Sequence, residues 1–368
     1  MVNAHSHAFQ RRLRGRAERL APAAAGADDF WTWREQMYRL AAGLDLEEIE
    51  RASGEAYLEM AGAGYGAVGE FHYLHHRPDG TPYEDPNASA KAVARAARAA
   101  GIALVLLPAA YARAGPDRPA EPRQRRFCDP SAAAFLGRVE ELRAWAEREE
   151  GVAVGVAAHS VRAVPADWLE AIAAYSSEHG LVRHVHAAEQ PRELHEVRAE
   201  HRCSPIELLE HTGFLGPLAS VVHAIHVGPG DVELLADTGT TVVACPTTEG
   251  NLGDGHPPLL QLSDVGVPLA IGSDSQVRID PFEEARELET LARRERRTRH
   301  ALLAASGDLW TELRRAGARS LGLPLADVGE LELDRDHPDL QGIEDEDLPA
   351  ALVTCASAGA VSRPAGRR

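Results

Sequence analysis

Residues 88–111 read ASAKAVARAARAAGIALVLLPAAY, and this stretch sets the expected fold. Its first part predicts an amphipathic helix over residues 88–100, because apolar residues recur there with helical spacing. Gly101 is expected to end the helix, and the apolar run at residues 102–111 predicts a buried strand. A helix, a glycine and a continuous apolar strand form the repeating unit of a parallel α/β sheet.

The same unit recurs along most of the chain. Further helical patterns occupy residues 132–150, 168–180, 205–216, 231–239 and 259–266. Strands are expected at residues 1–7, 65–73, 102–111, 152–160, 181–189, 219–227, 240–249 and 267–275. No glycine-rich nucleotide-binding signature follows any of these strands, whereas eight alternating strands are typical of a (β/α)8 barrel. We therefore predict an α/β fold, a TIM-like (β/α)8 barrel over residues 1–325.

The composition disfavours several classes of protein. The chain has 368 residues, of which 44% are hydrophobic and 26% charged, and its formal net charge is −17. Such an acidic chain is a poor partner for nucleic acid or an anionic membrane, and no apolar run reaches the ~18 residues of a membrane span. Its four cysteines form no CxxC pair, so neither a disulfide framework nor a thiolate metal site is expected. We expect a soluble, cytoplasmic protein, with a homodimer left open.

Polar residues gather at the C-terminal ends of the predicted strands, where barrel enzymes carry their active sites. They are His5, His7, Glu70, His72, Tyr73, His159, His186, Glu189, His223, His226 and Asp274. His5 and His7 lie two apart in a strand and so face the same side. With His186 and Asp274 they would supply three imidazoles and one carboxylate, which suits Zn²⁺ without excluding Fe²⁺ or Mn²⁺. Lys91, the only lysine, lies in a predicted helix, so no strand-end lysine can bridge two ions and one metal ion per chain is expected.

Eight segments resemble the formimidoylglutamate deiminases of the amidohydrolase superfamily. They are NAHSHAFQR (3–11), DDFWTWREQMYR (28–39), EFHYLHHRPDG (70–80), GVAAHSVRAV (155–164), HVHAAEQ (184–190), VVHAIH (221–226), CPTTEGNLGDG (245–255) and GSDSQVRIDP (272–281). The HxH and SD elements are shared by many amidohydrolases, whereas the segments at 30–39, 70–76 and 245–255 are much more specific. The resemblance implies a zinc-dependent hydrolase of the metal-dependent barrel type that converts N-formimino-L-glutamate to N-formyl-L-glutamate and ammonia in histidine degradation.

That reaction suggests roles for the strand-end residues. Attack on an amidine carbon at neutral pH needs a metal ion that lowers the pKa of water toward ~7. Glu189, three residues after His186, is the expected proton shuttle between water and the departing nitrogen. His223 could orient or polarise the nucleophile, and Asp274 could accept a proton as well as bind metal. The sequence does not divide these roles.

The substrate is a dicarboxylate, and guanidinium groups bind carboxylates best because they form paired, charge-assisted hydrogen bonds. Arg34 and Arg162 are the candidates, and the resemblance adds Gln10, Tyr73 and His159 to the substrate pocket. Trp31 and Trp33 are expected to pack. His75, His76 and His226 are expected to serve structure or to support the metal ligands from behind. Thr247, Thr248, Glu249 and Asn251 are expected to form a structured loop near the pocket and have no assigned role.

Alternatives remain for the pocket and for the ends of the chain. The two arginines could be solvated surface residues, and the substrate could be a cyclic amidine such as a purine or another N-formimino amino acid. A shortened barrel could also bind metal without turnover. Enzymes of this resemblance have an upstream segment forming half of a small β-sandwich, so we expect that the chain begins late, for which a misplaced start codon is one explanation. Residues 326–368 are expected to be a remnant of that sandwich and a disordered tail.

Overall fold

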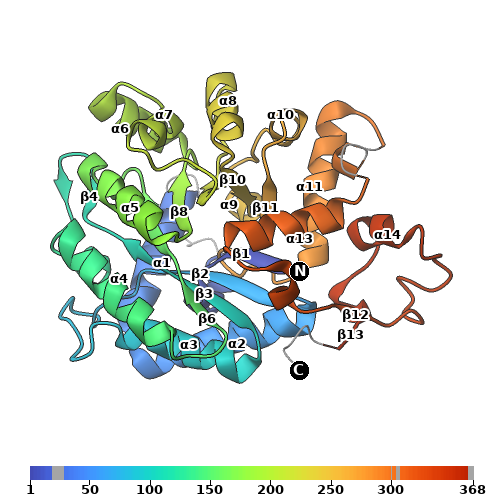
Figure 1. The fold of residues 1–368 in the computed structure, drawn as a ribbon, viewed down its shortest axis with the longest axis horizontal. Helices are drawn as coiled ribbons and strands as arrows, with labels where there is room; N and C mark the ends of the chain where they lie inside the picture. The colour runs from blue at the N-terminus through green and yellow to red at the C-terminus, as the bar shows by residue number, and fades with distance from the viewer. Residues whose placement is uncertain (19–28, 300, 304–306, 364–368) are drawn as a thin grey trace.

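A computed structural model describes residues 1–18, 29–299, 301–303 and 307–363 as a barrel of parallel strands with helices around it (Figure 1). The strand order is β1-β2-β3-β7-β8-β9-β10-β11, and β6 pairs with β3. These strands are β1 (Val2–Ser6), β2 (Ala67–His72), β3 (Ala103–Ala110), β6 (Val152–Val154), β7 (Val156–Ser160), β8 (Arg183–Ala187), β9 (Ala219–His223), β10 (Thr241–Ala244) and β11 (Leu269–Ile271). The predicted (β/α)8 barrel is confirmed.

Helices surround the barrel, and six of them overlap the predicted helical patterns at residues 88–100, 132–150, 168–180, 205–216, 231–239 and 259–266. The surrounding helices are α1 (Phe30–Gly43), α2 (Leu46–Ala63), α3 (Ala88–Ala100), α4 (Ala132–Ala146), α5 (Ala166–His179), α6 (Pro191–His201), α7 (Pro205–His211), α8 (Pro229–Thr238), α9 (Pro246–Leu252), α10 (Leu259–Asp264), α11 (Pro281–Arg296) and α13 (Leu309–Ser320). Gly101 ends α3 in the left-handed conformation, with φ of 71°, which glycine adopts without strain. Every residue of the following strand β3 is buried, as its continuous apolar sequence requires.

The barrel closes between its first and last strands. Ser6 forms a parallel bridge with Asp274, and the Asp274 amide donates to the carbonyl of His5 at 3.0 Å. Gly272 allows this approach, because a Cβ at that position would lie 2.8 Å from the Cβ of His5. Strand β1 is therefore fully buried although it begins at the second residue. Closure also brings the HxH sequence next to the aspartate of the eighth strand.

Three features interrupt the predicted pattern. The strand expected at residues 240–249 ends at Ala244, and the residues from Pro246 onward form α9. The strand expected at residues 152–160 is divided into β6 and β7, and a short hairpin, β4 (Arg113–Gly115) and β5 (Arg118–Pro119), follows β3. Ion pairs from Arg113 to Glu200 at 2.7 Å and from Arg118 to Glu196 at 2.6 Å join this hairpin to α6. The hairpin sequence has neither apolar alternation nor β-branched residues, so its pattern could not predict strands.

The C-terminal segment lies at one side of the barrel (Figure 1). It contains an antiparallel pair, β12 (Glu332–Leu333) and β13 (Val361–Arg363), and helix α14 (Leu348–Thr354). Leu340, Leu352 and Val353 are buried in the same hydrophobic core as the barrel residues. The described part of the expected tail is therefore packed against the barrel, while residues 364–368 lie outside the described residues. The division at residue 325 stays a prediction.

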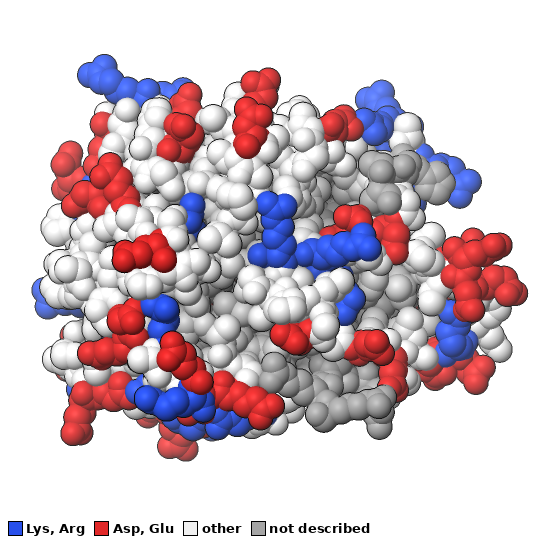
Figure 2. Space-filling view, in the orientation of Figure 1, with Lys and Arg blue, Asp and Glu red and all other residues white. Residues whose placement is uncertain are grey.

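Charged side chains of both signs are interspersed on the face in Figure 2, where acidic groups are the more widespread. None of the helices in the described ranges combines the length and apolar character that crossing a bilayer requires.

Candidate active site

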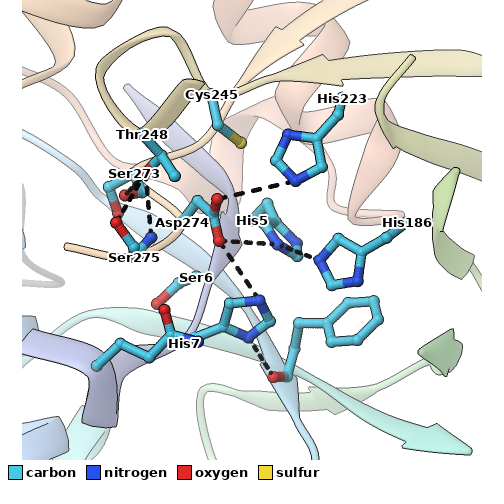
Figure 3. A network of polar contacts seen from close by, with 12 residues as sticks. His5, Ser6, His7, His186, His223, Cys245, Thr248, Ser273, Asp274 and Ser275 are labelled. Atoms are coloured by element: carbon cyan, nitrogen blue, oxygen red, sulfur yellow. Dashed lines mark hydrogen bonds and ion pairs between the residues drawn. The ribbon is translucent and has the colours of Figure 1, made fainter. Parts of the chain in front are cut away.

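The four predicted metal ligands lie together at the C-terminal ends of the strands (Figure 3). His5 and His7 come from β1 and the residue after it, His186 from β8, and Asp274 from the turn after β11. One ligand atom from each lies within 4.8 Å of the others, and all four residues are buried. The structure thus assembles the three imidazoles and one carboxylate that the sequence pattern predicts.

Hydrogen bonds behind two of the imidazoles orient their inner nitrogens. Nδ1 of His7 donates to the carbonyl of Phe71 at 2.9 Å, and Nδ1 of His186 donates to the carbonyl of His159 at 2.6 Å. Because these Nδ1 atoms carry the protons, the Nε2 lone pairs point inward. Burial lowers the pKa of His7 and His186, and of His5, so the imidazoles are neutral.

The inner nitrogen and oxygen atoms of these four residues lie close to one another. Nε2 of His5 and Nε2 of His186 are 3.0 Å apart, and Oδ1 of Asp274 lies 3.5 Å from the former and 3.4 Å from Nε2 of His7. Nδ1 of His5 is buried without a hydrogen-bond partner in the described structure. A neutral N₃O donor set with converging lone pairs fits a divalent transition metal.

Glu189 and His223 lie beside this group. Nε2 of His223 is 3.6 Å from Oε1 of Glu189 and 3.8 Å from Oδ2 of Asp274. Burial raises the pKa of Glu189 to about 8, with nearby Asp254 and Asp274 adding to the effect. Burial opposes the protonation of His223, but the adjacent carboxylates of Glu189, Glu249 and Asp274 outweigh it and raise its pKa to about 10. The pair can therefore hold a proton close to the candidate metal ligands.

Glu249 was missed by the sequence analysis, which assigned it no role. Its carboxylate is 1% exposed, and Oε1 accepts from Nδ1 of His223 at 3.2 Å and from the Cys245 amide at 2.8 Å. His223 has φ of 73°, a strained conformation for a residue with a side chain, so its direction depends on such contacts. His223, Cys245 and Glu249 could also form a second group of metal ligands. Burial, however, raises the pKa of Cys245 well above its usual range, which favours a protonated thiol and a hydrogen-bonded cluster without metal.

Glu193, on the first turn of α6, also supports the site from behind. Its carboxylate is buried and accepts from the amide of Ala188 at 2.6 Å, where the chain has φ of 56°. This contact fixes the turn that leads from His186 to Glu189. Burial raises the pKa of Glu193 to about 7.

All five predicted substrate-binding residues line one pocket together with the candidate catalytic group. Its lining includes Gln10, Arg34, Tyr73, His159 and Arg162 as well as His7, His186, Glu189, His223 and Asp274. Arg162 is 4% exposed and its Nη1 has no hydrogen-bond partner in the described structure. Among the described residues, neither Arg34 nor Arg162 forms an ion pair with a carboxylate, whereas many other arginines do. The alternative of solvated surface arginines is therefore wrong for Arg162, and Arg34 is half-buried.

Two of the remaining histidines form hydrogen bonds with backbone carbonyls and not with the candidate metal ligands. Nε2 of His75 donates to the carbonyl of Ala109, and Nε2 of His76 donates to that of Cys128, both at 2.9 Å. Both contacts hold loops, as a structural role requires. Nε2 of His226 is buried without a described partner.

The fold and the N₃O group define a metal-dependent hydrolase of the barrel type, and the chain belongs to the amidohydrolase family, whose family model matches residues 1–323. A formimidoylglutamate deiminase from Pseudomonas aeruginosa is 39% identical over 360 residues, covering 95% of this chain and 78% of that protein. A 5-methylthioadenosine/S-adenosylhomocysteine deaminase from Archaeoglobus fulgidus is 28% identical over 279 residues, covering 74% of this chain and 57% of that protein.

Solved structures agree on the fold. An amidohydrolase from Brucella melitensis superimposes with a TM-score of 0.87 at 33% identity, covering 100% of this chain and 85% of that one. An adenosine deaminase from Xanthomonas campestris with bound zinc has a TM-score of 0.79 at 23% identity, covering 98% and 77% of the two chains.

Proposed function

We propose that this chain hydrolyses N-formimino-L-glutamate to N-formyl-L-glutamate and ammonia, with one zinc ion per chain. The relative from Pseudomonas aeruginosa carries the name of this activity. The observation that carries the proposal is the pair Arg34 and Arg162, two cations that line the pocket beside the candidate catalytic group and form no ion pair with a carboxylate of the described residues. In a chain with a net charge of −17, guanidinium groups left unpaired in a pocket indicate an anionic ligand.

In the proposed complex, the carboxylates of the substrate contact arginines, and its amidine group lies beside the candidate metal ligands. Arg34 and Arg162 bind the two carboxylates, each of which matches the planar fork of a guanidinium group. Gln10 and Tyr73, joined by a hydrogen bond of 2.8 Å, and neutral His159 shape the wall between the two ends of the substrate. The amidine carbon then lies toward His186 and Asp274.

The chain's own residues would move the protons. Zinc held by His5, His7, His186 and Asp274 would act as a Lewis acid that makes water a better nucleophile near neutral pH. Glu189 accepts one proton as water adds to the amidine carbon and passes it to the imino nitrogen, which becomes an amino group. The second proton comes from the new hydroxyl group, and Asp274 or Glu189 passes it to the same nitrogen as the C–N bond breaks, so that ammonia leaves and the formyl C=O forms. His223, held by Glu249, donates a hydrogen bond toward the developing negative charge.

A product assay tests this proposal. Zinc-loaded protein is incubated with N-formimino-L-glutamate, and ammonia and N-formyl-L-glutamate are measured together, with N-formimino-L-aspartate as the comparator. Equal amounts of the two products, formed faster than from the aspartate derivative, are expected. No ammonia from protein with a full equivalent of zinc would reject the activity and favour a barrel without turnover. A cytoplasmic location belongs to the same proposal, because it fits a metabolic enzyme, and a homodimer stays an open expectation.

A further inference from the structure

Three guanidinium groups from separate elements surround one indole ring. Trp31 lies on α1, and Arg34, one turn later on the same helix face, has its Cζ 4.5 Å from the centroid of the Trp31 ring. Arg162, which follows β7, has its Cζ 5.0 Å from that centroid, and Arg192, on the first turn of α6, has its Cζ at 4.6 Å. The sequence analysis expected Trp31 simply to pack; the structure places it among cations.

The closeness of the Arg34 and Arg162 side chains needs an explanation. Like charges repel, and burial together with nearby Arg162 lowers the pKa of Arg34. Arg192 has a carboxylate partner, since its Nε donates to Glu196 at 2.9 Å. Among the described residues, Arg34 and Arg162 have no such partner. The indole is the group that attracts both, because the negative face of tryptophan is the strongest aromatic partner for a cation.

Trp31 is not among the residues that line the pocket, whereas Arg34 and Arg162 are. We propose that Trp31 is a positioning residue, which holds Arg34 and Arg162 ready for the two carboxylates of a dianionic ligand. The identity of that ligand rests on the proposed function. Because Trp31 holds both guanidinium groups in place before the ligand arrives, binding costs less side-chain entropy. Loss of Trp31 should therefore weaken the affinity for the ligand more than it lowers the rate of the chemical step.

The test compares Trp31→Leu and Trp31→Phe with Trp145→Leu in zinc-loaded protein. Trp145 is a matched control, because it also carries a cation near its ring, Lys91 Nζ at 5.6 Å, but does not line the pocket. Binding of N-formyl-L-glutamate and of the monocarboxylate N-formylglycine is measured by calorimetry, and KM and kcat are measured for N-formimino-L-glutamate. Binding does not depend on turnover.

For Trp31→Leu we expect the Kd of N-formyl-L-glutamate and the KM to rise roughly 10- to 100-fold, with kcat within about threefold. The Kd of N-formylglycine should rise less, because one carboxylate engages fewer guanidinium groups. Trp31→Phe should recover part of the loss, and Trp145→Leu should match the parent.

An unchanged Kd in Trp31→Leu, an equal loss for both ligands, or a Trp31→Phe variant no better than Trp31→Leu would each overturn the inference. If Trp31→Leu fails to fold, Trp31→Phe decides, since its smaller quadrupole should still raise the Kd for the dicarboxylate selectively. Turnover by the parent with an unchanged Kd in the variants would reject this inference alone, whereas selective binding without turnover would reject the proposed function alone.

Discussion

Replacing Arg162 by methionine tests how the pocket recognises a dianion. Arg162 is 4% exposed and forms no direct ion pair with a carboxylate of the described residues, so its replacement breaks no ion pair within the protein. Substrate binding would instead leave one carboxylate desolvated and unpaired, which costs roughly 2 to 5 kcal/mol for a truncated buried charge pair. At about 1.4 kcal/mol per tenfold, kcat/KM should fall between about 30-fold and about 4,000-fold. Arg162→Lys keeps the charge but not the fork and should fall between the parent and Arg162→Met.

The assay is steady-state ammonia release from N-formimino-L-glutamate, with metal content measured on the same samples. Arg98→Met is the matched control, because Arg98 is an exposed arginine on α3 that pairs with Glu149. The control should keep the parent's kcat/KM, and all variants should keep their metal. An Arg162→Met variant within about threefold of the parent would refute the reasoning and make the cyclic-amidine alternative the better account.

Four further outcomes follow from the site. Glu189→Gln should retain metal but lose turnover by roughly 10²- to 10⁴-fold, and near-normal turnover would remove it from proton transfer. His186→Ala should lose the single equivalent of zinc measured in the parent, whereas two tightly bound equivalents in the parent would refute one ion per chain. Glu249→Gln should keep its hydrogen bonds but lose its charge, lowering kcat roughly 10- to 100-fold without loss of metal; an unchanged kcat would show that His223 does not need it. Because burial raises the pKa of Glu193 from its usual value near 4.5 to about 7, the folded state favours the protonated acid, and the parent should lose stability as pH rises from 4.5 to 7. Glu193→Gln removes this loss. The unfolding free energy of the variant should therefore equal that of the parent near pH 4.5 and exceed it by at most about 3 kcal/mol above pH 7. A difference between variant and parent that does not depend on pH would contradict this prediction.

The sequence predicted the barrel and the four candidate metal ligands because both depend on local sequence patterns. Continuous apolar strands such as β3 are recognisable without tertiary information, and the ends of parallel strands meet at one edge. His5, His7, His186 and Asp274 each lie at such an end, so their convergence followed from the topology. The hairpin of β4 and β5 did not, because its ion pairs to α6 supply what its sequence lacks.

Other features needed the three-dimensional structure. Long cationic side chains are exposed or buried according to their tertiary neighbours, so the burial of Arg162 had no signal in an arginine-rich chain. Glu249 on α9 contacts His223 at the end of β9, and Trp31 on α1 contacts Arg162, which follows β7. Each contact joins residues far apart in sequence, where neither periodicity nor spacing carries information.

A competition experiment tests the central claim most directly, that Arg34 and Arg162 commit this hydrolytic site to a linear dicarboxylate. Zinc-loaded protein receives equal concentrations of N-formimino-L-glutamate and guanine, and the two products are followed together to give the ratio of the kcat/KM values. A pocket built around two carboxylate-binding guanidinium groups should favour N-formimino-L-glutamate by roughly 10⁴-fold, because guanine would leave buried Arg162 and half-buried Arg34 without an anionic partner. Hydrolysis of guanine at an equal or greater rate would contradict the account.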